Sequence, residues 1–231
     1  MYQLFIGNKN YSSWSLRPWV LMKTLDIPFA EQLVPFADGT SGASWDRFRA
    51  FSPTGKVPCL VDGATTVWES AAIVEYLAER HPGVWPADPQ ARAWARCASA
   101  EMHAGFSALR NSCTMNCGVR VQVDASAPGL QQDIARLSEL WNEGLARFGG
   151  PYLAGPEFTA VDAFFAPVAF RFQTYGLQAS GAAQAYPARL LALNSMREWE
   201  QAALAEPWRE PGHEAEAKAA GSWLADLRQV G

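Results

Sequence analysis

The chain has 231 residues, of which 49% are hydrophobic and ten are tryptophan, enough for one large packed domain or two smaller ones. Nineteen basic and 23 acidic residues give a formal net charge of -4, so the composition provides no net positive field to attract nucleic acid or an anionic membrane. The longest apolar stretches, such as 163–170, are far shorter than the roughly 20 residues that cross a bilayer, and four scattered cysteines are too few for a disulfide framework.

The first fifty residues alternate strand and helix signals. Residues 2–6 form a compact apolar run, which predicts a short strand and not a secretion signal, so a cytoplasmic location is expected. Helical spacing then continues to Asp26, and Pro18 favours a helix start near Ser15 because proline fits best in a first turn. A second strand is expected at 29–34, which makes a β-α-β unit. A polar stretch from 38 to 44 leads to a short helix predicted at 45–51.

Two further strands and a helix complete this region. The runs 57–61 and 65–68 flank Asp62-Gly63, a strong hairpin signal, so these strands are expected to be antiparallel. Glu69-Ser70 then opens a helix that ends near residue 81, before Pro82-Gly83. The order of elements is that of a thioredoxin-like domain, which we place at residues 1–81.

Beyond this domain the pattern becomes helical. Residues 82–89 contain three prolines and read as a linker. Every later periodic segment has helical spacing, which predicts an all-helical C-terminal domain over residues 90–231. The expected helices are one long helix at 90–110 and others at 130–148, 160–174, 187–204 and 213–228.

Residues 12–15 (Ser-Ser-Trp-Ser) carry the first chemical signal. They fall in the turn between the first strand and the first helix, where free N–H groups and the helix dipole favour an anion such as a thiolate. The alternative is plain helix capping, for which serine is a preferred residue.

Three other local features are notable. Lys56-Val57-Pro58 places a proline at a strand start, which indicates either an edge strand or a cis bond that turns the Val57 backbone outward as a docking edge. Glu69 and Ser70 suit a helix N-terminus, and they also suit the ammonium and carboxylate of one amino-acid head group. Residues 159–162 have capping-box spacing, which is structural.

These features occur together, in one order and with suitable spacing, and in this they resemble the glutathione transferase family. The resemblance spans essentially the whole chain and is strongest at 2–80 and 153–167. Residues 12–17 (Ser-Ser-Trp-Ser-Leu-Arg) are similar to the Ser-Ser-Cys-Ser-x-Arg signature of the zeta class. Trp14 stands where that signature has cysteine, so maleylacetoacetate isomerase activity, the zeta hallmark, is not assumed.

The resemblance implies a glutathione site with named contacts. Val57, before a cis Pro58, would pair with the cysteinyl backbone of glutathione, while Glu69 and Ser70 would hold its γ-glutamyl end. Lys56 would face the glycyl carboxylate.

The family also implies that Ser12 meets the glutathione sulfur, and Ser13 and Ser15 remain rivals for that role. A free thiol with a pKa of about 8.5 is only a few per cent thiolate at neutral pH. One hydrogen bond to the charged sulfur and a helix N-terminus together would lower that pKa by about one to three. We therefore expect Ser12 to stay protonated and to stabilise the thiolate without removing a proton.

The second substrate is expected to be a small hydrophobic electrophile beside the helical domain. Trp14 is one candidate contact, and His103, Ser107 and Arg110 are others because a single helix would present them at three- to four-residue spacing. Phe106, Met102 and Met115 read as core. By family resemblance, the protein is expected to form a homodimer. The histidines and cysteines show no metal-ligand spacing, so no metal is expected.

Three alternatives to conjugation are considered, of which disulfide exchange is disfavoured. Glutathione-dependent disulfide exchange normally needs a cysteine at the first helix, where this chain has serines, and Cys59 lies after Pro58. A non-catalytic binding or stress-response protein would bind glutathione without turnover. An isomerase of the zeta kind would regenerate glutathione, which product analysis with a cis-dienone acid would reveal.

Overall fold

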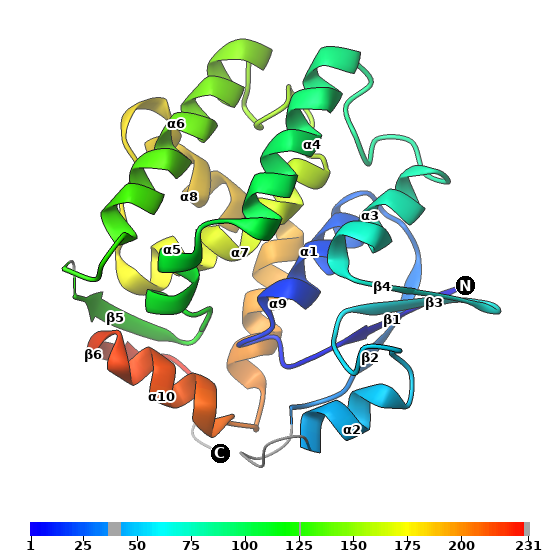
Figure 1. Cartoon of the computed structure of the whole chain (residues 1–231), viewed down its shortest axis with the longest axis horizontal. Helices are drawn as coiled ribbons and strands as arrows, with labels where there is room; N and C mark the ends of the chain where they lie inside the picture. The colour runs from blue at the N-terminus through cyan, green and yellow to red at the C-terminus, as the bar shows by residue number, and fades with distance from the viewer. Residues whose placement is uncertain (37–42, 125, 229–231) are drawn as a thin grey trace.

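The computed structural model describes residues 1–36, 43–124 and 126–228. An N-terminal sheet with three helices leads into a larger group of helices (Figure 1). The N-terminal elements are β1 (Tyr2–Ile6), α1 (Ser13–Thr24), β2 (Phe29–Leu33), α2 (Ala43–Arg49), β3 (Cys59–Asp62), β4 (Thr65–Trp68) and α3 (Ser70–Ala78). The later elements are α4 (Pro89–Ala104), α5 (Ser107–Ser112), β5 (Val119–Val123), α6 (Leu130–Phe148), α7 (Ala160–Tyr175), the 3-10 helix η1 (Gly181–Ala185), α8 (Tyr186–Leu191), α9 (Asn194–Ala205), α10 (Pro211–Ala219) and β6 (Gly221–Asp226).

The N-terminal sheet has the strand order β2-β1-β3-β4. β1 runs parallel to β2 and antiparallel to β3, and its Leu4 and Ile6 are fully buried. β3 and β4 are antiparallel, with Asp62 opposite Thr65, so the turn falls at Gly63, whose φ of 58° suits glycine. The predicted thioredoxin-like fold of this domain is confirmed. The polar residues 38–42 lie outside the described residues.

Helix α1 begins at Ser13, two residues earlier than expected, and contains Pro18. The ring of Pro18 fixes its backbone φ at a helical value, so the helix accommodates this residue. The only loss is the backbone hydrogen bond that the carbonyl of Trp14 would otherwise accept. Ser12 therefore occupies the N-cap position, and residues 13–15 form the first turn. Helix α2 likewise begins and ends two residues earlier than the predicted range of 45–51.

The helical character of the second domain is confirmed, and α7 lies at its centre. Nearly all of α7 is buried, and it packs against α1, α4 and α8 (Figure 1). At its start the Thr159 N–H donates to the carboxylate of Asp162 at 3.0 Å, as the capping-box spacing predicts. Asp162 also accepts from the Tyr186 hydroxyl at 2.8 Å, which links α7 to α8. No described helix has the length and apolar character that a membrane crossing requires.

The single long helix predicted at 90–110 is wrong. α4 ends at Ala104, Gly105 is extended, and Phe106 takes a left-handed conformation with a φ of 56° before α5 begins. A Cβ at Gly105 would lie 2.8 Å from the Glu101 carbonyl oxygen, so glycine permits the close approach at this break. Phe106 is 6% exposed, and its burial offsets the unfavourable backbone.

The C-terminal domain also contains a pair of strands that the all-helical prediction missed. The segment predicted as a helix at 213–228 is helical only as far as Ala219, and β6 follows it and pairs antiparallel with β5. The side chains of β6 alternate in exposure, as expected for a strand with one face covered. The segment 187–204 is likewise divided into α8 and α9.

Candidate functional site

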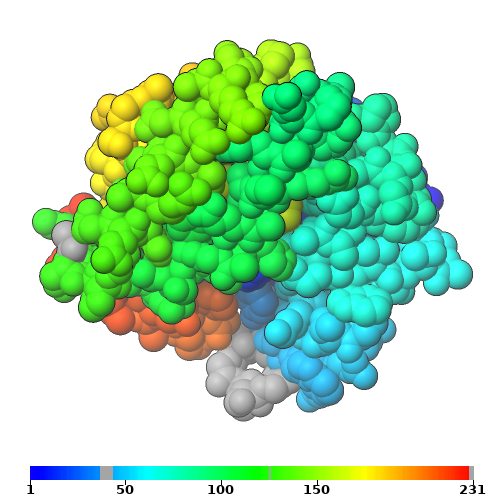
Figure 2. All heavy atoms as spheres, turned by 45° about the horizontal axis from the view of Figure 1, so that its top comes forward, coloured from blue at the N-terminus to red at the C-terminus, as the bar shows by residue number. Residues whose placement is uncertain are grey.

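A cavity of about 490 Å³ opens where the N-terminal sheet domain meets the helical domain. Its N-terminal walls come from residues 11–14, from residues 36, 44, 45 and 48, and from residues 55–57. The helical domain contributes residues 110, 114, 115, 171, 213 and 216. Figure 2 shows the surface hollowed where the green helices, the orange-red α10 segment and the blue-to-cyan N-terminal domain meet.

Two of the three candidate serines line this cavity. Ser12 and Ser13 reach it, whereas Ser15 is fully buried behind them. The Ser12 hydroxyl donates to Ser15 Oγ at 2.7 Å and not to a helix N–H, and Ser15 Oγ also accepts from the Gly7 N–H at 3.2 Å. The capping alternative therefore does not describe the Ser12 side chain. Its hydroxyl lies beside the free N–H groups that begin α1, where an anion is favoured.

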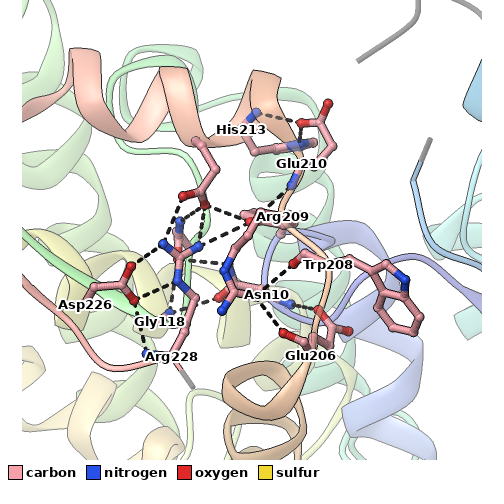
Figure 3. Close-up of polar contacts among 12 residues, drawn as sticks. Asn10, Gly118, Glu206, Trp208, Arg209, Glu210, His213, Asp226 and Arg228 are labelled. Atoms are coloured by element: carbon pink, nitrogen blue, oxygen red, sulfur yellow. Dashed lines mark hydrogen bonds and ion pairs between the residues drawn. The ribbon is translucent and has the colours of Figure 1, made fainter. Parts of the chain in front are cut away.

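Tyr11 also lines the cavity, but its hydroxyl is already engaged. It donates to Glu214 Oε1 at 2.7 Å and accepts from Arg228 at 3.3 Å. Burial and the neighbouring Glu214 raise the pKa of Tyr11 to about 12. Figure 3 shows Arg228 beside Asp226 and Gly118, so the end of the chain holds this network in place. Tyr11 is thus held as a structural residue, and Ser12 and Ser13 are the other hydroxyl-bearing residues of this wall segment.

The predicted docking edge lies at the next segment of the wall. The Val57–Pro58 bond is cis, and β3 begins only at Cys59, so Val57 precedes the residues that pair in the sheet. Val57 is half-buried and Lys56 is exposed, and both line the cavity. β3 and β4 pair as far as Cys59 and Trp68, so Pro58 directly precedes and Glu69 directly follows the paired residues.

Glu69 and Ser70 form a turn with unusual properties at the start of α3. Glu69 has a φ of 77°, which is uncommon for any residue but glycine and is typical of functional sites. Ser70 is fully buried, and its Oγ has no hydrogen-bond partner among the residues that the structure describes. An orphaned hydroxyl of this kind is open to a further hydrogen bond, but Glu69 and Ser70 are not among the residues that line the cavity.

The structure does not bring all the proposed second-substrate residues together. Trp14 and Arg110 line the cavity, whereas Ser107 is exposed outside it. His103 contacts Glu69 at 2.8 Å and faces a separate cavity of about 450 Å³ between α3 and α4. Burial lowers the pKa of His103, although the neighbouring Glu69 acts to raise it. The break at residues 105–106 leaves His103 in α4 and Arg110 in α5, on two different helices.

Sequence reasoning missed three charged or titratable residues of the cavity. Arg171 comes from the buried α7, and His213 and Glu216 come from α10. The periodic pattern around Arg171 indicates a helix but not which partner covers it. The positions of His213 and Glu216 depend on how the end of the chain folds back, for which the local sequence contains no signal.

The described residues show neither a metal-binding cluster nor a cysteine on the cavity wall. They contain no group of three or more His, Cys, Asp or Glu placed to hold a metal ion. Cys59 is buried and its thiol donates to the Phe51 carbonyl, and burial raises its pKa to about 11. This environment opposes thiolate formation and so does not suit disulfide exchange.

Comparisons with known proteins agree with this geometry. Residues 11–80 match the family model of the glutathione S-transferase N-terminal domain, and residues 124–210 match that of the C-terminal domain. The chain is 26% identical to a probable maleylacetoacetate isomerase of Caenorhabditis elegans over 73% of this chain and 77% of that protein. It is 29% identical to the maleylacetoacetate isomerase of Rattus norvegicus over 67% of this chain and 70% of that protein. A glutathione transferase homologue from Burkholderia, solved with bound glutathione, superposes with a TM-score of 0.63 at 22% identity, covering 87% of this chain and 97% of that one.

Proposed function

This chain belongs to the glutathione S-transferase family, and we propose that it transfers the glutathione thiolate to a small electrophile. The observation that carries the proposal is the cavity that joins the Ser12 hydroxyl, the start of α1 and the Val57 backbone. It offers a thiolate site and a peptide-docking edge side by side. We place the glutathione-binding unit at residues 1–81 and the second-substrate wall in residues 90–231.

We assign each part of glutathione to one of the predicted residues. The sulfur lies near Ser12, and the cysteinyl backbone pairs with Val57, whose backbone lies outside the sheet pairing. The γ-glutamyl carboxylate suits the unpartnered Ser70 hydroxyl, and its ammonium suits Glu69. Lys56 at the opposite end of this edge suits the glycyl carboxylate. Support also comes from the bound glutathione in the Burkholderia homologue.

Ser12 acts in this proposal as a hydrogen-bond donor and not as a base. Ser12 Oγ has a donor proton that now goes to Ser15, and rotation about its Cβ–Oγ bond redirects that proton to the sulfur. Ser15 Oγ keeps the Gly7 N–H as a partner when this happens. A hydrogen bond to the charged sulfur is stronger than the neutral one it replaces, so the exchange favours the thiolate.

A second candidate function is favoured by the relatives. The proteins from C. elegans and rat are named as maleylacetoacetate isomerases, which suggests a glutathione-dependent isomerase. In that reaction the thiolate adds to a cis double bond, the carbon–carbon bond rotates, and the thiolate leaves. The same thiolate site serves both reactions, and Trp14 replaces the cysteine of the zeta signature.

The test compares binding, conjugation and isomerisation in the same preparation. Calorimetry measures the affinity for glutathione and for S-methylglutathione, and mass spectrometry detects the adduct with 1-chloro-2,4-dinitrobenzene. A glutathione-dependent adduct supports conjugation, while conversion of a cis-dienone acid with full recovery of glutathione supports the isomerase. Binding with neither product would identify a non-catalytic glutathione-binding protein, and absence of binding would refute the proposed site.

A further inference from the structure

Two arginine side chains, one from α1 and one from α5, contact the Trp14 ring. Arg17 of α1 lies with its Cζ 4.2 Å from the centre of the Trp14 ring, and Arg110 of α5 lies 4.7 Å from it. Arg171 of α7 lies within electrostatic range of both, and it lines the cavity together with Arg110 and Trp14. Two guanidinium groups therefore form part of the wall that faces the second substrate.

The hydrogen bonds of these arginines go to neutral oxygens. Arg171, which is 5% exposed, donates from Nε to the Cys113 carbonyl at 2.8 Å and from Nη1 to the Pro167 carbonyl at 3.2 Å. Arg110 donates to two backbone carbonyls at its own helix junction, at 3.2 and 3.4 Å. Within the described ranges, no carboxylate lies at ion-pair distance from either of them. Neither of the two wall arginines is thus paired with an acid among the described residues.

Arg17 adds an unpartnered buried charge behind the wall. Its side chain is buried, and its Nε and Nη1 have no hydrogen-bond partner in the described structure. Burial, and then the neighbouring Arg171 and Arg110, lower the pKa of Arg17 to about 9, and burial lowers that of Arg171 to about 10. Both remain protonated at neutral pH, so the cluster is a desolvated positive centre that an anion would relieve.

We propose that the electrophile carries a carboxylate, which binds to Arg110 and Arg171 while its reactive carbon faces the sulfur near Ser12. This inference rests on the proposed conjugation and adds the chemical class of its second substrate. A guanidinium fork matches the two oxygens of a carboxylate, and the partly buried site strengthens the attraction. Trp14 and Met115 supply apolar surface on the same wall for the body of the substrate.

A negatively charged residue on the same cavity opposes the arginines. Glu216 of α10 lines the cavity and is exposed, and it is too far from Arg110 and Arg171 to form an ion pair with either. It repels a carboxylate that enters, whereas the arginines attract one. Removing Glu216 and removing Arg110 should therefore shift the preference for an anionic substrate in opposite directions.

The test uses 4-chloro-3,5-dinitrobenzoate and its uncharged methyl ester. In both, the thiolate forms a carbon–sulfur bond at the ring carbon, and chloride leaves with the electron pair of the carbon–chlorine bond. The quantity measured is the ratio of kcat/KM for the benzoate to kcat/KM for the ester at saturating glutathione. The variants are Arg110→Met, Arg110→Lys, Glu216→Gln and, as a distant control, Arg147→Met on the exposed side of α6.

The expected result is a ratio that falls about tenfold or more in Arg110→Met, less in Arg110→Lys, and rises in Glu216→Gln, with Arg147→Met like the wild type. Thermal unfolding confirms that each variant is folded. A ratio that stays constant across all variants overturns the anion site while conjugation of the ester still supports the proposed function. If neither compound is conjugated, the proposed function fails. In that case the anion site is tested by the affinity for unreactive 3,5-dinitrobenzoate, measured by quenching of tryptophan fluorescence. Equal affinities of the wild type and Arg110→Met would overturn the anion site.

Discussion

Replacing Ser12 by alanine should raise the pKa of the bound glutathione thiol. A hydrogen bond to a charged group contributes about 1.5 to 3 kcal/mol, but the Ser12 hydroxyl must first give up its neutral bond to Ser15, which contributes about 0.5 to 1.5 kcal/mol. The difference is about 1 kcal/mol. This corresponds to a rise in the thiol pKa of nearly one, and to a fall in conjugation rate of up to about tenfold below that pKa.

The assay is the pH dependence of kcat/KM for conjugation, together with the ultraviolet absorbance of the bound thiolate. Glutathione affinity should change little because Val57, Glu69 and Ser70 are untouched. Ser13→Ala is the matched control, since Ser13 lines the same cavity. It should leave the kinetic pKa unchanged.

Ser15→Ala separates a structural effect from a catalytic one. Ser15 is fully buried and accepts from the Gly7 N–H, so its loss leaves a buried donor unpaired. The free energy of unfolding should fall by about 1 to 3 kcal/mol. The kinetic pKa should not rise as it does in Ser12→Ala.

A raised pKa in Ser13→Ala alone would assign the sulfur to Ser13, and no change in any of the three variants would refute the serine mechanism.

Three further predictions concern the network at the end of the chain. Tyr11→Phe removes a hydrogen bond to the carboxylate of Glu214, so chemical denaturation should show a loss of about 1.5 to 3 kcal/mol with no change in the kinetic pKa of the thiol. A Cβ at Gly118 would meet the Arg228 side chain, so Gly118→Ala should destabilise the fold by about 1 to 3 kcal/mol, and an unchanged melting temperature would contradict this packing. Burial raises the pKa of Glu206 to about 7 from its ordinary 4.5. The folded state therefore holds this proton more tightly than the unfolded chain, and the free energy of unfolding should fall by about 3 kcal/mol as pH rises from about 4.5 to about 7. Urea unfolding across that range should show the slope in the wild type and a flatter one in Glu206→Gln.

Several parts of the fold were determined by the local sequence. The hairpin at Asp62-Gly63, the capping box at 159–162 and the helix at 130–148 each rest on residues that interact with near neighbours in the chain. Such signals act before any tertiary contact forms, so they can be recognised from spacing alone. The division of the 90–110 segment was marked by Gly105, but helical periodicity continues across it and concealed the break.

The composition of the cavity was decided by tertiary structure. The serine segment and the Val57-Pro58 pair were visible as motifs, but nothing local indicated that Arg171 faces the same space or that Tyr11 is held by Arg228. β5 and β6 pair although about a hundred residues separate them, and this pairing positions α10 against the cavity. Sequence alone thus indicated a candidate thiolate site at residues 12–15. Which charges face the second substrate depended on long-range packing, because the side chains that meet there come from helices far apart in the chain.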